Sequence, residues 1–290
     1  MNFASNLVRH GRSRSIFKIS QLPKEKEAKL KQYLQPLERV IVAYSGGVDS
    51  TYLLYMAGQT LGGDNVVAVI ACSLTYPVEE AEAAIKIAGN FGVNCLIMRT
   101  EEINDENFLV NSKERCYYCK KELFLKLRKA ANGQGIQHLL DGSNADDMND
   151  YRPGNRAKAE FAVKSPLQEI GFTKEEIRLL SKEAGLITWD KPSLACLASR
   201  IPYGRRIDRE VLGMVEKGEK LLKALGFRQV RVRHHGNTAR IEVEQKALAK
   251  FMEEKIRRAV ADEFKKIGFT YVTVDLAGYR TGSLNEVLGG

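Results

Sequence analysis

The stretch "VIVAYSGGVDST" at residues 40–51 places a short hydrophobic run directly before two glycines. A β-branched run, a glycine-containing turn and a helical pattern predict a buried strand, a loop and a helix. Backbone N–H groups, the positive end of the helix and the hydroxyls of Ser45 and Ser50 can all point at one anion in such a loop. Gly46 and Gly47 let the backbone approach that anion closely, because they carry no side chain. The stretch therefore predicts a phosphate-binding loop.

The alternation of strands and helices continues beyond this loop. Further hydrophobic runs predict strands at 66–72, 95–100 and 138–143, with amphipathic helical patterns between them. Strands that alternate with helices predict an α/β fold with a doubly wound parallel sheet. The loop then lies at the carboxyl edge of the sheet, where ligands bind in such folds. Thr173 and Glu176 have the spacing of a capping box, which predicts the start of a later helix.

The Pro- and Gly-bearing stretch at 190–206 predicts a boundary between two domains. A length of 290 residues also favours two hydrophobic cores. We expect a nucleotide-binding domain over residues 21–200 and a smaller C-terminal α+β domain over 201–290, which binds substrate or mediates oligomerisation. The elements expected in the second domain are helices near 208–225 and 245–267, a hairpin that turns at Gly236 and Asn237, and a strand at 271–276.

Charge and composition favour a soluble cytoplasmic protein. The chain has 45 basic and 36 acidic residues, and this excess is spread along it, which favours a solvated surface over a nucleic-acid groove. No apolar run approaches the roughly 20 residues that span a bilayer. Five cysteines without a signal peptide indicate a reducing compartment, with Cys72 and Cys95 as ordinary buried thiols. Residues 1–20 are basic without an acid, and we expect a disordered leader; a transit peptide has the same composition.

The loop matches neither G-x-x-x-x-G-K-[ST] nor G-x-G-x-x-G. The pattern S-G-G-x-D-S after a buried strand resembles the pyrophosphate loop of the PP-loop ATP pyrophosphatases, and a purely structural turn is the alternative. Fixed donors and Mg²⁺ stabilise a leaving pyrophosphate, so Asp49 is either a metal-binding acid or an acid favoured by the helix dipole. Asp146 and Asp147 follow the fourth predicted strand as candidate Mg²⁺ ligands, although acids that cap the next turn would look the same.

Three cysteines form a second candidate site. Cys116 and Cys119 lie three residues apart at the start of a predicted helix, so both thiols can face one side. Cys196 lies in the predicted boundary stretch. Three thiolates leave one position open for an exogenous ligand, which suits an iron cluster or another metal. A zinc site completed by His138 and unconnected thiols are the alternatives.

Five motifs follow one another in an order that resembles the LarE family of ATP-dependent sulfur transferases. They are "SGGVDS" (45–50), "ERCYYCKKELF" (114–124), "DGSNADDMNDYRPG" (141–154), "PSLACLASRIPYG" (192–204) and "RVRHHGNTARIEV" (231–243). The resemblance runs from about residue 24 to the C-terminus. It implies sulfur insertion into pyridinium-3,5-biscarboxylic acid mononucleotide, which yields the precursor of the nickel-pincer nucleotide of lactate racemase. ATP adenylylates a ring carboxylate and releases pyrophosphate, and a sulfur donor then displaces AMP.

The resemblance implies two possible sulfur sources. Family members with only the cysteine that matches Cys196 surrender its sulfur and keep dehydroalanine. Members that also carry the CxxC hold a [4Fe–4S] cluster on three thiolates, with a transferable sulfide on the fourth iron. Since Cys116, Cys119 and Cys196 are all present, the resemblance favours the cluster.

The resemblance also implies a substrate site. Arg231, Arg233 and Glu242 match family positions near the substrate phosphate, and guanidinium groups bind phosphate in a bidentate way. A basic, exposed strand face is the alternative. Arg200 follows Cys196 closely, and it either holds the substrate carboxylate or AMP, or pairs within its own loop.

Two rival functions use the same motifs. A tRNA 2-thiolation enzyme also combines a PP-loop with a CxxC and a third cysteine, and it would use basic charge to hold RNA. The short final domain, without a separate RNA-binding module, argues against it. A nucleotide-binding or zinc-binding protein without turnover is the second rival. We expect a homo-oligomer that uses ATP, Mg²⁺ and a small mononucleotide, with no nucleic-acid or membrane partner.

Overall fold

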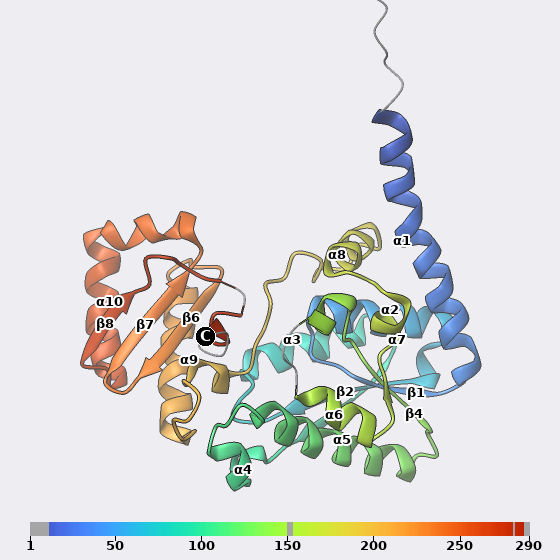
Figure 1. Cartoon of the computed structure of the whole chain (residues 1–290), viewed down its shortest axis with the longest axis horizontal. Helices are drawn as coiled ribbons and strands as arrows, with labels where there is room; N and C mark the ends of the chain where they lie inside the picture. Colours follow the sequence, from blue (N-terminus) through green and yellow to red (C-terminus); the bar gives the residue numbers. More distant parts are fainter. Residues whose placement is uncertain (1–11, 150–152, 281, 287–290) are drawn as a thin grey trace, which may run out of the picture.

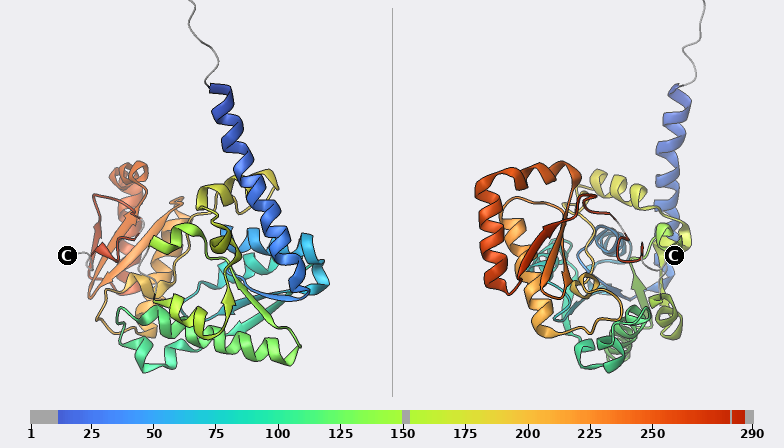
Figure 2. Two further views of the ribbon diagram at one scale, coloured as in Figure 1. Left: turned by 45° about the vertical axis from the view of Figure 1, so that its right-hand side comes forward. Right: turned by 60° about the vertical axis from the view of Figure 1, so that its left-hand side comes forward.

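The structure is a computed structural model that describes residues 12–149, 153–280 and 282–286. The chain forms two α/β units, one around a five-stranded sheet and one around a three-stranded sheet (Figure 1). The chain passes from the larger to the smaller unit in the stretch between α8 (Lys174–Glu183) and α9 (Arg209–Ala224). Figure 2 shows from two further sides that the units lie next to each other.

The larger sheet has strand order β3-β2-β1-β4-β5, and all its strands are parallel. The prediction of a doubly wound parallel sheet is therefore confirmed, and the four predicted strands agree with the observed ones within two residues at each end. Their bounds are β1 (Val40–Ala43), β2 (Val66–Cys72), β3 (Asn94–Arg99), β4 (His138–Asp141) and the short, unpredicted β5 (Val163–Lys164). The order reverses between β1 and β4, so their carboxyl ends flank the switch point where such sheets bind ligands.

Helices cover both faces of this sheet. One face packs against α1, α2, α3, α7 and α8, and the other against α5 and α6. The predicted capping box is confirmed, since the Thr173 hydroxyl and the Glu176 carboxylate each accept from the other residue's backbone N–H. The remaining bounds are α1 (Arg12–Leu34), α2 (Val48–Leu61), α3 (Val78–Gly89), α4 (Glu106–Leu109), α5 (Arg115–Gly133), α6 (Gly154–Glu160) and α7 (Pro166–Ile170).

The expected leader falls into two parts. Residues 1–11 lie outside the described residues, whereas residues 12–20, which we expected to be disordered, form the first turns of α1. Leu30 and Leu34 anchor the other end of α1 in the core, and an anchored helix adds turns at little cost. Among the described residues, no helix combines the length and the apolar character that crossing a membrane requires.

The smaller unit contains the predicted hairpin. Strands β6 (Val230–His235) and β7 (Thr238–Val243) pair antiparallel, and β8 (Tyr271–Val274) adds parallel to β7. The long helix expected at 245–267 is wrong, because a 3-10 turn at Gln245–Met252 precedes α10 (Glu254–Ile267). This break accompanies the stacking of Phe251 on Phe227 in the core, with ring centroids 4.7 Å apart.

The stretch between α8 and α9, which we call the linker (residues 184–208), is fixed to the larger unit. Leu197 and Ile201 pack with Phe108 in a hydrophobic cluster that also includes residues of α9. The fully buried Asn111 amide donates to the carbonyl groups of Pro202 and Arg205, both at 2.9 Å. The linker is therefore an ordered segment held between the two units.

Candidate active site

The loop between β1 and α2 requires glycine for steric reasons. Gly46 has φ +63°, and a Cβ there would lie 2.7 Å from the Cβ of Ala84. Gly142, at the end of β4, packs as closely, because its Cβ would lie 2.8 Å from the backbone N and Cα of Ser50. Only glycine accommodates the left-handed backbone and such close approaches. The loop and the start of α2 are therefore fitted between β4 and α3.

The predicted hydroxyl groups meet at this loop. The Oγ atoms of Ser45 and Ser50 lie 3.1 Å apart, and Ser50 Oγ donates to the Gly47 carbonyl at 3.3 Å. Gly47 is the N-cap of α2 and makes no side-chain cap, so the first N–H groups of the helix are available to a ligand. Hydroxyl and amide donors at a helix N-terminus suit a phosphate.

Two lysines reach the loop from distant segments, although the loop itself contains none. Lys174 Nζ pairs with Asp49 Oδ2 at 2.5 Å, across 125 residues of sequence. Lys191 Nζ donates to the Gly46 carbonyl at 3.0 Å, across 145 residues. No local pattern could have identified either lysine, because each contact depends on the complete fold.

The negative charge of Asp49 is partly compensated by Lys174. Burial raises the pKa of Asp49, and the ion pair with Lys174 opposes this shift. Its Oδ1 atom is buried without a hydrogen-bond partner, which leaves one carboxylate oxygen for a cation. Oxygen ligands of this kind suit Mg²⁺, so the Oδ1 atom without a hydrogen-bond partner would fit a magnesium ion.

The two acids after β4 have different partners. Asp147 Oδ2 accepts from the backbone N–H of Asn144 at 3.0 Å and so caps the turn that follows the strand, as in the second interpretation. Asp146 Oδ2 accepts instead from the backbone N–H of Lys174 at 2.8 Å, at the start of α8. Asp147 nevertheless lies near enough to Asp49 to raise its pKa. Asp150, a third acid of the same stretch, lies outside the described residues.

The structure brings the three cysteines together where the two units meet. Cys116 and Cys196 line one pocket of about 430 Å³, and Cys119 packs with Cys196 against the hydrophobic cluster between the units. Burial raises the pKa of Cys119 well above its usual value, and Glu102, Cys196 and Cys116 add to the shift. The three sulfur atoms are thus close enough to affect each other's charge.

A buried arginine faces these sulfur atoms. Arg115 is 2 % exposed and donates to Asn111 Oδ1 and the Ala198 carbonyl, while its Nε is buried without a partner. Burial would lower the pKa of Arg115, but Cys196 and Cys116 outweigh this and raise it. No acidic side chain of the described ranges forms an ion pair with it. An uncompensated buried guanidinium fits an anionic sulfur centre such as three thiolates around an iron cluster.

A single metal ion held by the three cysteines has less support than a cluster. Within the described residues, no three His, Cys, Asp or Glu side chains are placed to hold one metal ion. The ligands of a four-iron cluster bind different iron atoms, so they need not converge on one point. His138 begins β4 and so lies at the amino edge of the sheet, whereas the start of α5 lies at the carboxyl edge. It therefore does not complete a zinc site with the cysteines.

Arg200 fixes the backbone at Cys196. It pairs in a bidentate way with Glu219 of α9 at 2.7 and 3.0 Å, and its Nη1 donates to the carbonyls of Ala195 and Cys196 at 3.0 and 3.1 Å. Burial alone would raise the pKa of Glu219, but Arg200 holds it below its usual value. These contacts agree with the interpretation that Arg200 pairs within its own loop. Glu219 was not identified from the sequence.

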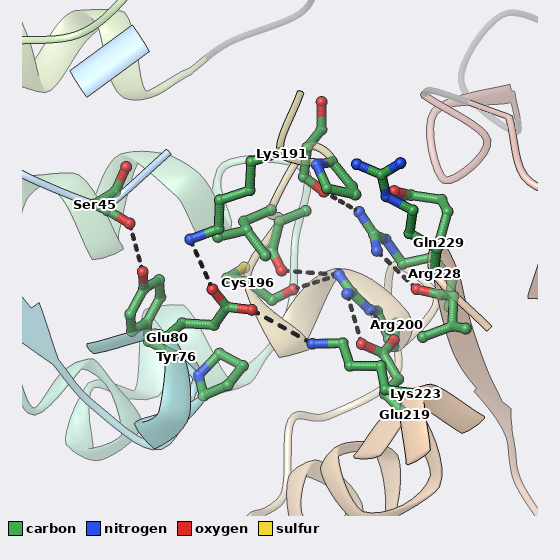
Figure 3. Close-up of a pocket in the computed structure, with 17 residues that line it drawn as sticks. Ser45, Tyr76, Glu80, Lys191, Cys196, Arg200, Glu219, Lys223, Arg228 and Gln229 are labelled. Atoms are coloured by element: carbon green, nitrogen blue, oxygen red, sulfur yellow. Dashed lines mark hydrogen bonds and ion pairs between the residues drawn. The ribbon is translucent and has the colours of Figure 1, made fainter. Parts of the chain in front are cut away.

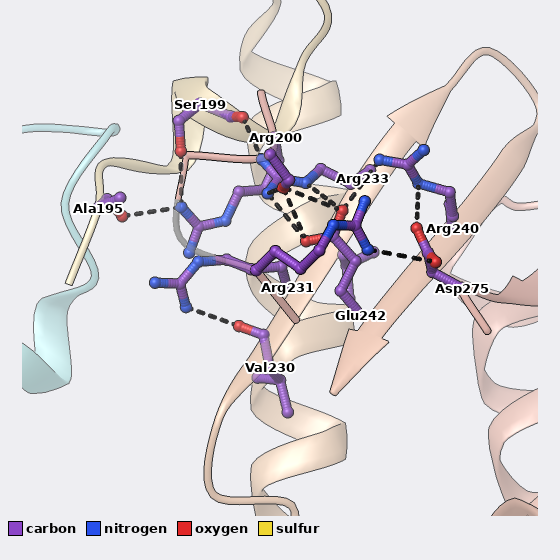
Figure 4. A network of polar contacts seen from close by, with 12 residues as sticks. Ala195, Ser199, Arg200, Val230, Arg231, Arg233, Arg240, Glu242 and Asp275 are labelled. Atoms are coloured by element: carbon purple, nitrogen blue, oxygen red, sulfur yellow. Dashed lines mark hydrogen bonds and ion pairs between the residues drawn. The ribbon is translucent and has the colours of Figure 1, made fainter. Parts of the chain in front are cut away.

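The two arginines on β6 differ in their partners: Arg233 forms an ion pair, whereas Arg231 forms none with an acid of the described residues (Figure 4). Arg233 pairs with Glu242 through two bonds of 2.9 Å, and Glu242, which is fully buried, also accepts from Arg240. Arg231 donates only to the carbonyls of Val230 and Ser193, and no acid of the described residues pairs with it. Burial, followed by the charge of Arg200, lowers the pKa of Arg231 to about 10.

The pocket between the units is lined by cationic side chains. Besides Arg231, they are Lys120, Lys158, Arg233 and Arg280, together with Arg115 beside the sulfur atoms. Lys158 is buried and donates to Ser143, Ser165 and Gln168 at 3.1 to 3.2 Å. A pocket with this lining suits a small ligand that carries phosphate or carboxylate groups.

The S-G-G-x-D-S loop at the switch point of a parallel sheet defines the class of PP-loop enzymes, which use ATP. The NAD synthase family model matches residues 22–126. A protein of Synechocystis is 42% identical over 259 residues, which are 89% of this chain and 96% of that protein. The pyridinium-3,5-bisthiocarboxylic acid mononucleotide synthase of Lactiplantibacillus plantarum is 38% identical over 265 residues, 91% of this chain and 95% of the synthase.

These matches show the family. The chain belongs to the LarE family of PP-loop enzymes and is an ATP-dependent sulfur transferase. A Methanocaldococcus jannaschii protein is also similar, 32% identical over 245 residues, which are 84% of this chain and 92% of that protein.

Proposed function

We propose that this enzyme inserts sulfur into pyridinium-3,5-biscarboxylic acid mononucleotide and so makes the thiocarboxylated precursor of the nickel-pincer nucleotide. The similarity to the Lactiplantibacillus plantarum synthase supports this substrate. The observation that carries the proposal is the position of the linker, which holds Cys196 between the pocket beside Ser45 and the cation-lined pocket of Arg231. Carboxylate activation and sulfur delivery then take place next to each other.

In the first step a ring carboxylate attacks the α-phosphorus of ATP. The bond from that phosphorus to the bridging oxygen breaks, and pyrophosphate leaves with the electron pair. The N-terminal amide groups of α2 and the hydroxyls of Ser45 and Ser50 stabilise this leaving group. Asp49 would hold Mg²⁺, which neutralises part of the pyrophosphate charge. The product is an acyl adenylate.

In the second step a sulfur atom attacks the activated carbonyl, and AMP leaves. Cys116, Cys119 and Cys196 would hold a [4Fe–4S] cluster, which supplies a transferable sulfide when bound. Arg115 stabilises the negative charge of the thiolates, and Arg200 with Glu219 keeps Cys196 in place. Arg231 binds the phosphate of the mononucleotide, because it is the β6 arginine whose charge lacks an acidic partner among the described residues.

Anaerobic iron and sulfide analysis tests the sulfur source. We expect the wild type to bind iron after reconstitution, and Cys116→Ser, Cys119→Ser and Cys196→Ser to lose it. Cys72→Ser is the matched control, because Cys72 packs against the core of the sheet, away from the pocket. Dehydroalanine at position 196 after turnover, in protein without iron, would show instead that Cys196 itself gives up its sulfur.

The substrate is tested by product analysis. We expect pyrophosphate and AMP to be released only when the pyridinium dicarboxylate mononucleotide is present, together with a mass increase of the mononucleotide that corresponds to exchange of oxygen for sulfur. Release of pyrophosphate with tRNA, with binding that weakens steeply as salt rises, would instead favour the tRNA 2-thiolation enzyme. Failure to release pyrophosphate with either would contradict an enzymatic role.

A further inference from the structure

Lys191 connects the PP-loop to the segment that carries Cys196. It lies on the linker five residues before Cys196, and its ammonium contacts both the Gly46 carbonyl at 3.0 Å and Glu80 Oε2 at 3.0 Å. Its side chain is 19% exposed, so these contacts are largely shielded from water. Ser45, Lys191 and Cys196 line the same pocket (Figure 3).

The ionic balance around Lys191 leaves excess positive charge beside the loop. Glu80 is shared, because Lys223 of α9 lies 3.4 Å from its second oxygen. Two ammonium groups thus face one carboxylate, whose pKa they hold below its usual value despite burial. Arg200 and Arg228 line the same pocket, but each has its own acid, Glu219 and Asp190. The charge that Glu80 leaves uncompensated is therefore available to an anion at the loop.

We propose that Lys191 is a phosphate-binding residue of the ATP site, and that its ammonium moves from Glu80 to the phosphates held by the loop. This inference rests on the proposed function. Glu80 keeps Lys223 when Lys191 leaves, so the exchange buries no unpaired carboxylate. The loop lacks the lysine that phosphate loops of the G-x-x-x-x-G-K-[ST] type carry, and Lys191 supplies the missing charge from a distant segment.

The backbone that leads from Lys191 to Cys196 has anchors of its own. The Ser193 carbonyl accepts from Arg231, and the carbonyls of Ala195 and Cys196 accept from Arg200. None of these bonds involves Lys191, so the exchange requires only a movement of the Lys191 side chain.

Calorimetric binding of inorganic pyrophosphate in the presence of Mg²⁺ tests the inference. We expect Lys191→Met to weaken binding about ten- to one-hundred-fold, as the loss of one charged hydrogen bond does, and Lys191→Arg to retain most of it. Glu80→Gln should strengthen binding, because Lys191 is no longer held back. The matched control is Lys220→Met. It removes the exposed ion pair between Lys220 of α9 and Glu79 of α3, the helices that carry Lys223 and Glu80, and it should leave binding unchanged.

A double variant separates direct contact from a general charge effect. If Glu80→Gln acts through Lys191, its gain disappears in the Lys191→Met background; a gain that persists there would overturn the inference. Equal weakening by Lys191→Met and Glu80→Gln, with a lower unfolding temperature for both, would show a purely structural role. Wild-type protein that binds no pyrophosphate would refute the proposed function instead, whereas normal binding by Lys191→Met refutes only this inference.

Discussion

Replacing Glu219 by glutamine leaves a buried guanidinium without its counter-charge. Arg200 is 2% exposed and Glu219 is 6% exposed, and bonds of 2.7 and 3.0 Å join them. Removing one member of a buried ion pair costs about 3 to 5 kcal/mol, because the other charge stays desolvated. Arg231 is close enough to Arg200 for the two charges to repel each other. We therefore expect Glu219→Gln to lower the free energy of unfolding by an amount near the upper end of this range.

The opposite substitution should cost less. In Arg200→Met, Glu219 still accepts from the backbone N–H of Val232 at 3.0 Å and lies near Arg231, whose charge lowers the pKa of Glu219. We expect Arg200→Met to be the milder variant by about 1.5 to 3 kcal/mol, which is the contribution of one charged hydrogen bond. The double variant Arg200→Met/Glu219→Gln should lose less than the sum of the two, since it leaves neither member of this ion pair as a charge without its partner.

Urea unfolding followed by tryptophan fluorescence measures this directly. Trp189, the only tryptophan of the chain, lies on the linker and is 37% exposed, so it reports on the segment that Arg200 anchors. Lys220→Met is the control, because its ion pair with Glu79 is exposed and should contribute nothing measurable. The reasoning is refuted if Glu219→Gln unfolds at the same urea concentration as the wild type. It is also refuted if the loss of stability in the double variant equals the sum of the two single losses.

The dependence on pH has a definite sign. Arg200 lowers the folded pKa of Glu219, so the stabilisation is present above the unfolded value near 4.5 and is lost as the pH falls through the lower folded value. The difference in the free energy of unfolding between wild type and Glu219→Gln should therefore be constant at neutral pH and shrink as the pH falls from about 4.5 to the lower folded pKa of Glu219. A difference that grows on acidification would contradict the assignment of the ion pair.

Substitutions at three further positions test the other parts of the site. Gly46→Ala would place a Cβ 2.7 Å from Ala84 at φ +63°, so we expect roughly a hundred-fold slower pyrophosphate release in a coupled phosphate assay, because the loop donors are displaced. Arg231→Lys should raise the KM for the mononucleotide roughly ten-fold and leave that for ATP unchanged, as measured by steady-state kinetics. Arg115→Met should reduce the iron bound per chain after anaerobic reconstitution, and Arg115→Lys should keep most of it.

The sequence predicted the elements that have a local pattern. Strands β1 and β2 and the hairpin of β6 and β7 were identified because alternating or continuous hydrophobic runs and turn residues lie within a few positions of each other. The break before α10 was missed, because the helical pattern continues through it and the constraint comes from the packing of Phe251 against Phe227. Local periodicity carries no information about such a distant contact.

The same distinction holds within the site. Ser45, Gly46 and Asp49 form a contiguous motif, so the loop chemistry was readable from the sequence. The partners of this motif and of Cys196, which include Lys174, Lys191 and Glu219, are single charged residues on helices or in the linker. A single lysine or glutamate in an amphipathic pattern is usually a solvated residue, and only the fold assigns it a partner.

The position of Cys196 on a linker has a physical consequence for the chemistry. On one side, Arg200 donates to the Cys196 carbonyl and pairs with Glu219 of α9. On the other side, the N–H of the next residue, Leu197, donates to the Thr75 carbonyl of the larger unit at 2.8 Å. A thiol anchored by both units keeps its place only while the units keep theirs. Glu80 of the larger unit also lies 3.4 Å from the ammonium of Lys223 in α9, across the same junction. The geometry of sulfur delivery therefore depends on the interface between the units as well as on the residues of the pocket.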